Sequence, residues 1–275
     1  MAKEKLILNG IEVFVEHENL GKTRRMLHDP LIMVHGWTAD HFRNYPVFKH
    51  LAKKGLPVVC YDLRGHGWSQ KNLEGKNTYT LSSAVQDLTE LVKHVMEIYD
   101  YPSVSLYGHS MGGTIALAYA VYNKITLDRL FLLAPWMKKG ASKEMLEVFE
   151  LLLQGYEKRF EREFKRKKKE QEKLGLEFFP HWEDPTLFPE KNAVIQFGKD
   201  MFENDVDINL IKNLDIPVHI IIGTRDRPDL KNTANILHES IPDSTLDVLE
   251  SGHGYAIERR DIVPKIIEKY LVREN

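Results

Sequence analysis

A pentapeptide at residues 108–112, Gly-His-Ser-Met-Gly, constrains the fold of this chain more than any other feature. It follows a short run at 104–107 that is rich in β-branched and aromatic residues and leads into an Ala-rich run at 114–122, so we expect a strand, a sharp turn and a helix in direct succession. Glycine on both sides suits a turn that holds Ser110 in a strained backbone conformation, with its hydroxyl clear of the main chain. The same turn places the Met111 amide at the start of the helix, where it points toward any negative oxygen that forms beside the serine.

The pentapeptide also fits an ordinary glycine-flanked turn, because three fixed positions in five recur by chance. The choice depends on partners elsewhere in the chain. A serine hydroxyl of ordinary acidity is a poor nucleophile, so it needs an imidazole within hydrogen-bond reach and a carboxylate that holds the imidazole in the useful tautomer.

Asp226 and His253 are the partners that the sequence offers. Each follows an expected strand directly, as Ser110 does, and parallel sheets gather their ligand sites at those strand ends. His253 also lies between two glycines, which distinguishes it from most of the twelve histidines. Asp229 is the alternative acid, but it lies beyond Pro228 and is suited to capping the next helix, so we favour Asp226.

A second loop follows an early expected strand at 31–34 and reads His-Gly-Trp. In a serine hydrolase, such a loop supplies a second backbone N–H to the reacting oxygen, and Gly36 would let it approach closely. We therefore expect the amides of Trp37 and Met111 to form the oxyanion hole. Gly36 as a plain turn residue, with Trp37 as a core aromatic, is the alternative.

The remaining pattern predicts an α/β fold in which a mostly parallel sheet begins with an antiparallel hairpin. Short β-rich runs flank Asn9-Gly10, the dipeptide most typical of a tight hairpin turn. Further strands are expected at 57–61, 128–134, 218–222 and 245–249, and helices at 45–54, 80–99, 230–241 and 255–272.

Residues 137–213 interrupt this alternation, which divides the chain into a core of residues 1–136 and 214–275 and an inserted helical cap. Apolar residues recur at helical intervals between 145 and 160, and a basic run at 165–169 follows. We interpret the basic run as a solvated helix face, with attraction to an anionic lipid surface as the alternative. The aromatic run at 178–182 also belongs to this insertion.

Other polar residues are assigned structural roles. Asp62 and Arg64 lie in a glycine-rich segment, where a charged pair more often holds a loop by hydrogen bonds than performs catalysis. His66 in the same segment is a weaker candidate for the site. Cys60 is the single cysteine, and its strand-like surroundings favour a buried hydrophobic role.

Composition excludes several other classes of protein. The formal net charge of −2 gives no general reason to expect nucleic-acid binding, and no apolar run approaches the length of a membrane span. No cluster of residues has metal-ligand spacing, and no glycine-rich phosphate motif follows a strand, so we expect neither a metal nor a cofactor. The N-terminal residues lack the apolar core of a secretion signal, which favours a cytoplasmic location.

These motifs together resemble the α/β-hydrolase superfamily, from the His-Gly-Trp loop through the serine turn to Asp226 and His253. Within it, the serine turn, the segment 62–69 and the run 41–57 look most like monoacylglycerol lipases and related carboxylesterases. The resemblance implies an α/β-hydrolase fold and cleavage of a small acyl ester through an acyl-enzyme on Ser110, with substrate contacts from Trp37, His109 and Trp136.

Three alternatives stay open beside the ester hydrolase. Similar serine turns occur in cofactor-free haloperoxidases and in C–C bond hydrolases of the same superfamily, and a non-catalytic ligand receptor could also be built on this fold. Haloalkane dehalogenases and most epoxide hydrolases of the fold carry aspartate as the nucleophile, which separates them from a chain with Ser110.

Overall fold

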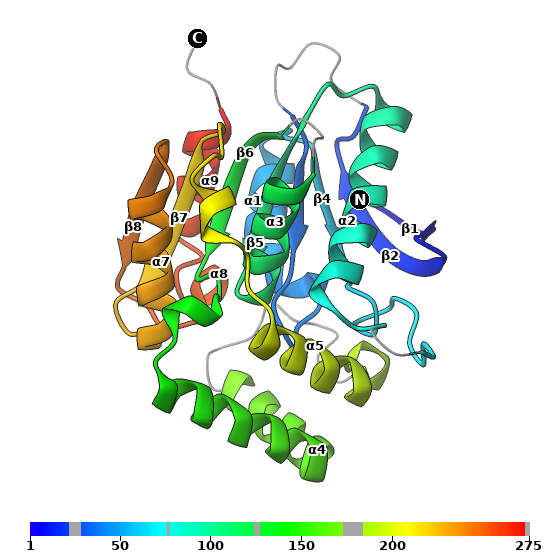
Figure 1. Ribbon diagram of the computed structural model, residues 1–275. Coiled ribbons are helices and arrows are strands. Elements are labelled where there is room, and N and C mark those ends of the chain that lie inside the picture. Colours follow the sequence, from blue (N-terminus) through cyan, green and yellow to red (C-terminus); the bar gives the residue numbers. More distant parts are fainter. Residues whose placement is uncertain (22–28, 76–77, 124–126, 173–183, 273–275) are drawn as a thin grey trace.

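The computed structural model describes residues 1–21, 29–75, 78–123, 127–172 and 184–272. The sheet and its flanking helices form one layered body, with two further helices across one end of the sheet (Figure 1). The aromatic run expected at 178–182 lies outside the described residues.

One sheet of eight strands organises the described chain, in the spatial order β1-β2-β4-β3-β5-β6-β7-β8. β1 pairs antiparallel with β2, and β2 with β4, whereas every other pairing is parallel. The strands are β1 (Ala2–Leu8), β2 (Ile11–Glu18), β3 (Leu31–Val34), β4 (Val58–Tyr61), β5 (Val104–His109), β6 (Leu127–Leu133), β7 (Val218–Gly223) and β8 (Ser244–Leu249). The expected α/β-hydrolase architecture is confirmed.

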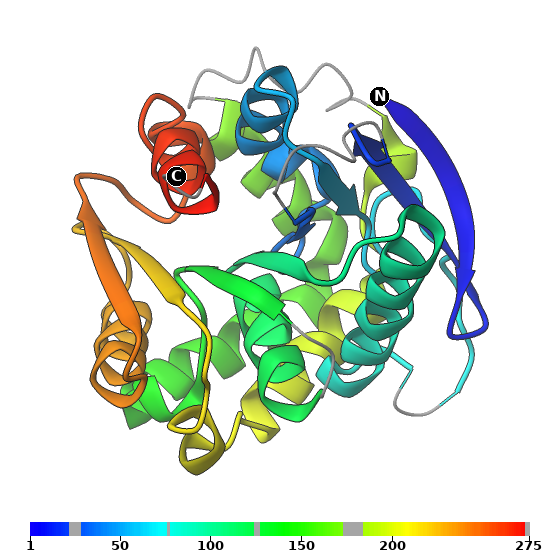
Figure 2. The ribbon, with the colours of Figure 1, turned by 90° about the horizontal axis from the view of Figure 1, so that it is seen from above.

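Helices cover both faces of the sheet. α1 and α9 lie on one face, and α2, α3 and α7 lie on the other (Figure 2). Because both faces are covered, strands β3 and β4 are buried at every residue, as expected for uninterrupted apolar runs. The α-helices are α1 (Tyr45–Lys53), α2 (Leu81–Tyr99), α3 (Met111–Tyr122), α4 (Lys143–Glu172), α5 (Lys191–Glu203), α6 (Ile208–Ile211), α7 (Pro228–Ser240), α8 (Tyr255–Glu258) and α9 (Val263–Leu271), and the short 3₁₀ helices are η1 (His41–Asn44), η2 (Lys138–Gly140) and η3 (Pro185–Leu187).

Local chemistry explains where the elements turn and stop. Asn9 and Gly10 take positive φ values of 47° and 77°, which is the type I′ geometry that joins β1 to β2. Thr80 caps α2, since its side chain accepts a hydrogen bond from Ser83 N. No helix of the described residues is both long and apolar enough to cross a membrane.

The single helix expected at 255–272 is wrong. The structure has two helices there, α8 and α9, and Arg259 lies between them with φ −120° and ψ 41°. Pro264 lies in the first turn of α9 and lacks the N–H that a continuous helix would donate four residues back. Apolar spacing continued across this break, so periodicity alone did not reveal it.

Asp62 and Arg64 support the loop as expected. The Asp62 carboxylate accepts hydrogen bonds from the amides of His41 and Trp68, both at 2.8 Å. Arg64 donates to both oxygens of the Asp87 carboxylate, at 2.7 and 2.6 Å, and both side chains of this pair are buried. Burial raises the pKa of Asp87, and the Arg64 guanidinium opposes that rise.

Replacing Arg64 with methionine should lower the free energy of unfolding by about 3–5 kcal/mol, because the Asp87 charge would remain buried without its partner. Urea unfolding followed by far-UV circular dichroism measures the loss. Lys93→Met is the matched control. Lys93 pairs with Glu90 on the exposed surface of α2, the helix that carries Asp87, so its replacement should lower the free energy of unfolding by less than about 1 kcal/mol. Equal losses in the two variants would contradict the structural role of the buried pair.

Candidate active site

The serine turn has the strained geometry that the motif predicts. Ser110 takes φ 56° and ψ −120° between the end of β5 and the start of α3, and its amide donates to Leu133 O at 2.8 Å. A Cβ atom at Gly108 would lie 2.2 Å from Gly112 O, and one at Gly112 would lie 2.4 Å from Val34 O. The main chain is therefore packed too closely around Ser110 for any residue but glycine on either side.

Replacing Gly112 with alanine should lower the free energy of unfolding by about 1–3 kcal/mol, because the new methyl group would press on the main chain of β3. Gly155→Ala in α4 is the matched control, since its Cβ would have no atom within 4 Å. That change should raise stability by about 0.5–1 kcal/mol through helix propensity. Urea unfolding of the two variants checks the contrast, and a neutral result at Gly112 would count against the tight turn.

The structure brings the C-terminal ends of parallel strands together, and with them the residues selected from the sequence. Asp226 follows β7 and His253 follows β8, and His253 Nδ1 lies 3.2 Å from Asp226 Oδ2. The other Asp226 oxygen accepts from Arg227 N at 2.8 Å. Asp229 instead pairs with the Arg227 guanidinium at 3.1 and 2.7 Å, which leaves Asp226 as the carboxylate beside the imidazole.

Several contacts hold the His253 loop in place. His109 Nε2 donates to His253 O at 3.0 Å, and burial keeps the pKa of His109 well below its ordinary value. The Glu258 carboxylate accepts from the amides of Gly252 and Gly254, at 2.8 and 3.2 Å. The glycine-bounded loop that the sequence showed is thus fastened to both the serine turn and α8.

Ser110 and His253 line one cavity of about 320 Å³. Among the described residues, no hydrogen bond joins Ser110 Oγ to the imidazole. Catalytic hydrogen bonds are often long in unliganded enzymes and shorten when the substrate binds. The position of Ser110 and His253 in one cavity is therefore the observation that links the two residues.

The loop expected to supply the oxyanion hole packs directly on the serine turn. A Cβ atom at Gly36 would lie 3.1 Å from His109 O and 3.3 Å from Ser110 Cβ. Trp37 lines the cavity, and its indole Nε1 donates to Val194 O of α5 at 2.8 Å. Met111 begins α3, and the first amides of a helix have no acceptor within the helix.

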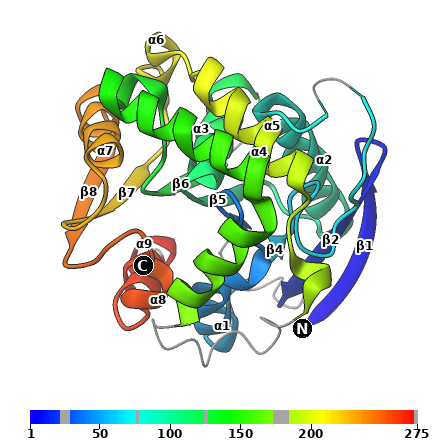
Figure 3. The ribbon, with the colours of Figure 1, turned by 90° about the horizontal axis from the view of Figure 1, so that it is seen from below.

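The three residues expected to contact substrate, Trp37, His109 and Trp136, all line the cavity. Phe149 of α4 packs against both indole rings, with centroids 5.5 Å from Trp37 and 5.9 Å from Trp136. Leu152 of α4 and Met201 of α5 extend the same apolar wall. Figure 3 shows α4 and α5 crossing this end of the sheet.

Two arginines, Arg43 and Arg227, also line the cavity and were not selected from the sequence. Arg43 lies in η1, inside the run 41–57 that contributed to the family resemblance, but nothing in that run distinguished it as a site residue. His66 is not among the described residues that line the cavity. It is buried with Nδ1 3.0 Å from Arg64 O, and burial lowers its pKa to about 3.

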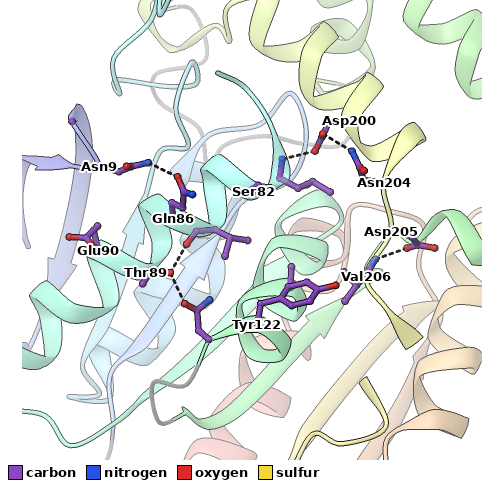
Figure 4. A pocket seen from close by; sticks show the side chains of 15 residues that line it. Asn9, Ser82, Gln86, Thr89, Glu90, Tyr122, Asp200, Asn204, Asp205 and Val206 are labelled. Carbon is purple, nitrogen blue, oxygen red and sulfur yellow. Dashed lines mark hydrogen bonds between the residues drawn. The ribbon is translucent and has the colours of Figure 1, made fainter. Parts of the chain in front are cut away.

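A second hollow, of about 920 Å³, lies between α2, α3 and the end of α5 (Figure 4). Its polar groups bond mainly to neighbouring protein groups: Thr89 Oγ1 donates to Asn123 Oδ1 at 3.2 Å, and Asp200 Oδ2 accepts from Leu81 N at 2.7 Å. No histidine is among its described lining residues. The described residues also contain no group of three that could hold a metal ion.

A family model described as alpha/beta hydrolase fold matches residues 29–259. The chain belongs to this family. The esterase EaEST from Exiguobacterium antarcticum superposes with a TM-score of 0.80 over 98% of this chain and 99% of that one, at 20% identity, which shows the shared fold.

Curated relatives differ in their chemistry. The soluble epoxide hydrolase of Corynebacterium sp. (strain C12) is 35% identical over 104 residues, which are 38% of this chain and 34% of that protein. Monoacylglycerol lipase ABHD6 of Rattus norvegicus is 24% identical over 89% of this chain and 76% of that protein. The family therefore establishes a hydrolase fold with small-molecule substrates, and family membership alone does not select one reaction.

Proposed function

We propose that this protein is a serine hydrolase that cleaves carboxylic esters, such as monoacylglycerols or other short- to medium-chain acyl esters. The observation that carries the proposal is the cavity shared by the strained Ser110 and by His253, whose imidazole is paired with Asp226. The relative named as a monoacylglycerol lipase and the fold neighbour named as an esterase are consistent with it.

The reaction would proceed in two halves. Ser110 Oγ attacks the ester carbonyl carbon while His253 Nε2 takes its proton, and the Trp37 and Met111 amides stabilise the negative oxygen of the tetrahedral intermediate. The intermediate collapses as His253 returns the proton to the leaving alcohol, which gives an acyl-enzyme. Water then attacks the acyl-enzyme with His253 as the base, releasing the acid and restoring the serine.

Asp226 has an orienting role in both halves. Its carboxylate accepts the Nδ1–H of His253, which leaves Nε2 as the ring nitrogen able to accept the serine proton, and its negative charge stabilises the imidazolium that forms. No metal or cofactor takes part in this scheme.

The apolar wall formed by α4 and α5 suits an acyl chain, and we propose that residues 137–213 act as a cap over the site. Basic side chains gather near a break in α4 at Arg159, where φ is −141°. Weak contact of the cap with an anionic membrane surface, through its basic run at 165–169, is part of the proposal.

The test is hydrolysis of 4-nitrophenyl esters of increasing acyl length and of monoacylglycerols by the wild-type protein, together with labelling by a fluorophosphonate probe. We expect ester hydrolysis and labelling of Ser110. Peroxide consumption that depends on halide, without esterase activity, would favour the haloperoxidase alternative, and activity only on C–C substrates would favour the C–C hydrolase. Failure of the probe to label Ser110 would revive the non-catalytic receptor.

A further inference from the structure

Arg43 is a cation on the cavity wall whose guanidinium has no hydrogen-bond or ion-pair partner among the described residues. Its side chain lines the cavity that holds Ser110 and His253. The guanidinium makes no hydrogen bond or ion pair with any residue that the structure describes. The main-chain amide of Arg43 donates to Asp40 O at 3.1 Å. Burial lowers the pKa of Arg43, but guanidinium groups stay charged in proteins, so the site carries a fixed positive charge.

The other arginine of the cavity is neutralised. Both Nε and Nη2 of Arg227 donate to the Asp229 carboxylate, which therefore balances its charge. Arg43 has no equivalent carboxylate within ion-pair distance among the described residues. The two arginines thus differ in what they offer a ligand.

The two carboxyl groups whose charges act on Arg43, those of Asp40 and Glu258, are committed elsewhere. Asp40 caps η1 by accepting from Phe42 N, and burial raises its pKa to about 6. The carboxylate of Glu258 is bound to the amides on either side of His253. A partly buried guanidinium without a partner is costly, so a ligand anion that enters the cavity would gain a charge-assisted hydrogen bond.

The charged and the apolar parts of the cavity lining come from different elements. Arg43 belongs to η1, which packs against α8 next to the His253 loop, whereas the apolar wall belongs largely to α4 and α5. Figure 3 shows α8 and α1 on the opposite side of α4 from α5. A substrate that fills both parts would combine an apolar group with an anionic one.

We propose that Arg43 binds a free carboxylate of the substrate, and that the preferred substrates are small esters that also carry a carboxylate. The proposal rests on the proposed ester hydrolysis and narrows its substrate class. A cavity of about 320 Å³ suits a short molecule, and a guanidinium matches a carboxylate through two parallel hydrogen bonds.

Two pairs of matched esters test the preference and locate the anion. The first pair is 4-nitrophenyl hydrogen adipate and its neutral amide, with the carboxylate on the acyl side. The second pair is 4-carboxyphenyl butyrate and 4-carbamoylphenyl butyrate, with the carboxylate on the alcohol side. In one of the two pairs we expect kcat/KM to be about 10- to 100-fold higher for the acid than for the amide. This factor corresponds to the free energy of one hydrogen bond between charged groups. Equal kcat/KM for acid and amide in both pairs would overturn the proposal.

Variants then assign the preference to Arg43. Arg43→Met should reduce the ratio of kcat/KM for the acid to that for the amide to about one. Arg43→Lys should keep part of the preference for the acid, because lysine carries the charge but cannot make the two parallel hydrogen bonds of a guanidinium. Lys49→Met is the matched control. Lys49 is exposed on α1, so its replacement removes one positive charge outside the cavity. An unchanged ratio in Arg43→Met, or an equal fall in Lys49→Met, would refute the assignment.

Binding measured without turnover separates this proposal from ester hydrolysis itself. Isothermal titration of adipate, with adipamide and inorganic phosphate as comparisons, should show adipate binding to the wild type and at least tenfold weaker binding to Arg43→Met. If adipate binds but the protein cleaves no ester, the proposed anion site is supported and the proposed ester hydrolysis is refuted. Ester cleavage without adipate binding, or binding of phosphate alone, would overturn the carboxylate site.

A direct competition covers the case in which Arg43→Met does not fold. Adipate should inhibit wild-type hydrolysis of the neutral amide ester competitively, and adipamide should inhibit at least tenfold less. Equal inhibition by the two compounds would contradict the proposal.

Discussion

Replacement of Ser110 by alanine is expected to lower kcat for 4-nitrophenyl butyrate by about 10⁶-fold relative to wild type, because no other group can form the acyl-enzyme. The residual rate would come from the oxyanion donors and from binding alone. The measurement is a steady-state assay at high enzyme concentration, with fluorophosphonate labelling of the same samples.

The alanine variant should keep its fold. Ser110 makes its turn through backbone contacts, and the donation of its amide to Leu133 O does not depend on the hydroxyl. A far-UV spectrum and a urea midpoint close to those of the wild type would show this. Substantial esterase activity in a folded Ser110→Ala protein would refute the nucleophile assignment.

Replacement of Asp226 by asparagine should lower kcat by about 10⁴-fold, since an amide would no longer hold His253 in the tautomer whose Nε2 accepts the serine proton. The carboxylate lies 3.2 Å from His253 Nδ1, so the change acts directly on the imidazole. Steady-state kinetics with 4-nitrophenyl butyrate measures the loss.

Asp229→Asn is the matched control for that substitution. Asp229 pairs with the Arg227 side chain and lies three residues further along, so its loss should lower kcat by less than about tenfold. If the two asparagine variants showed the opposite order, Asp229 would be the orienting acid and the assignment made here would be wrong.

The sheet and most of its helices followed from local patterns. Uninterrupted apolar runs such as β3 and β4 can be buried only between two covered faces, and Asn9-Gly10 specifies a tight hairpin almost regardless of context. The end of the chain shows the limit of this reasoning. There the apolar spacing continued through a break that Pro264 imposes, and two helices formed where one was expected.

The site divides in the same way. Ser110, Asp226 and His253 could be selected because each follows a strand and two of them lie in glycine-rich turns, which are signals that a sequence carries locally. Nothing local marks Glu258, which binds the amides around His253, because its role exists only once α8 folds back on that loop.

The sequence by itself determined the order of the strands along the chain, the strained serine turn and the residues available for its chemistry, because each of these depends on propensity and spacing over a few neighbouring positions. Only the tertiary structure decided which carboxylate meets His253, which aromatic side chains line the cavity beside the serine, and that Arg43 lines that cavity with no side-chain partner among the described residues. These outcomes depend on contacts between segments far apart in the chain, and no local pattern encodes the distances at which such segments meet.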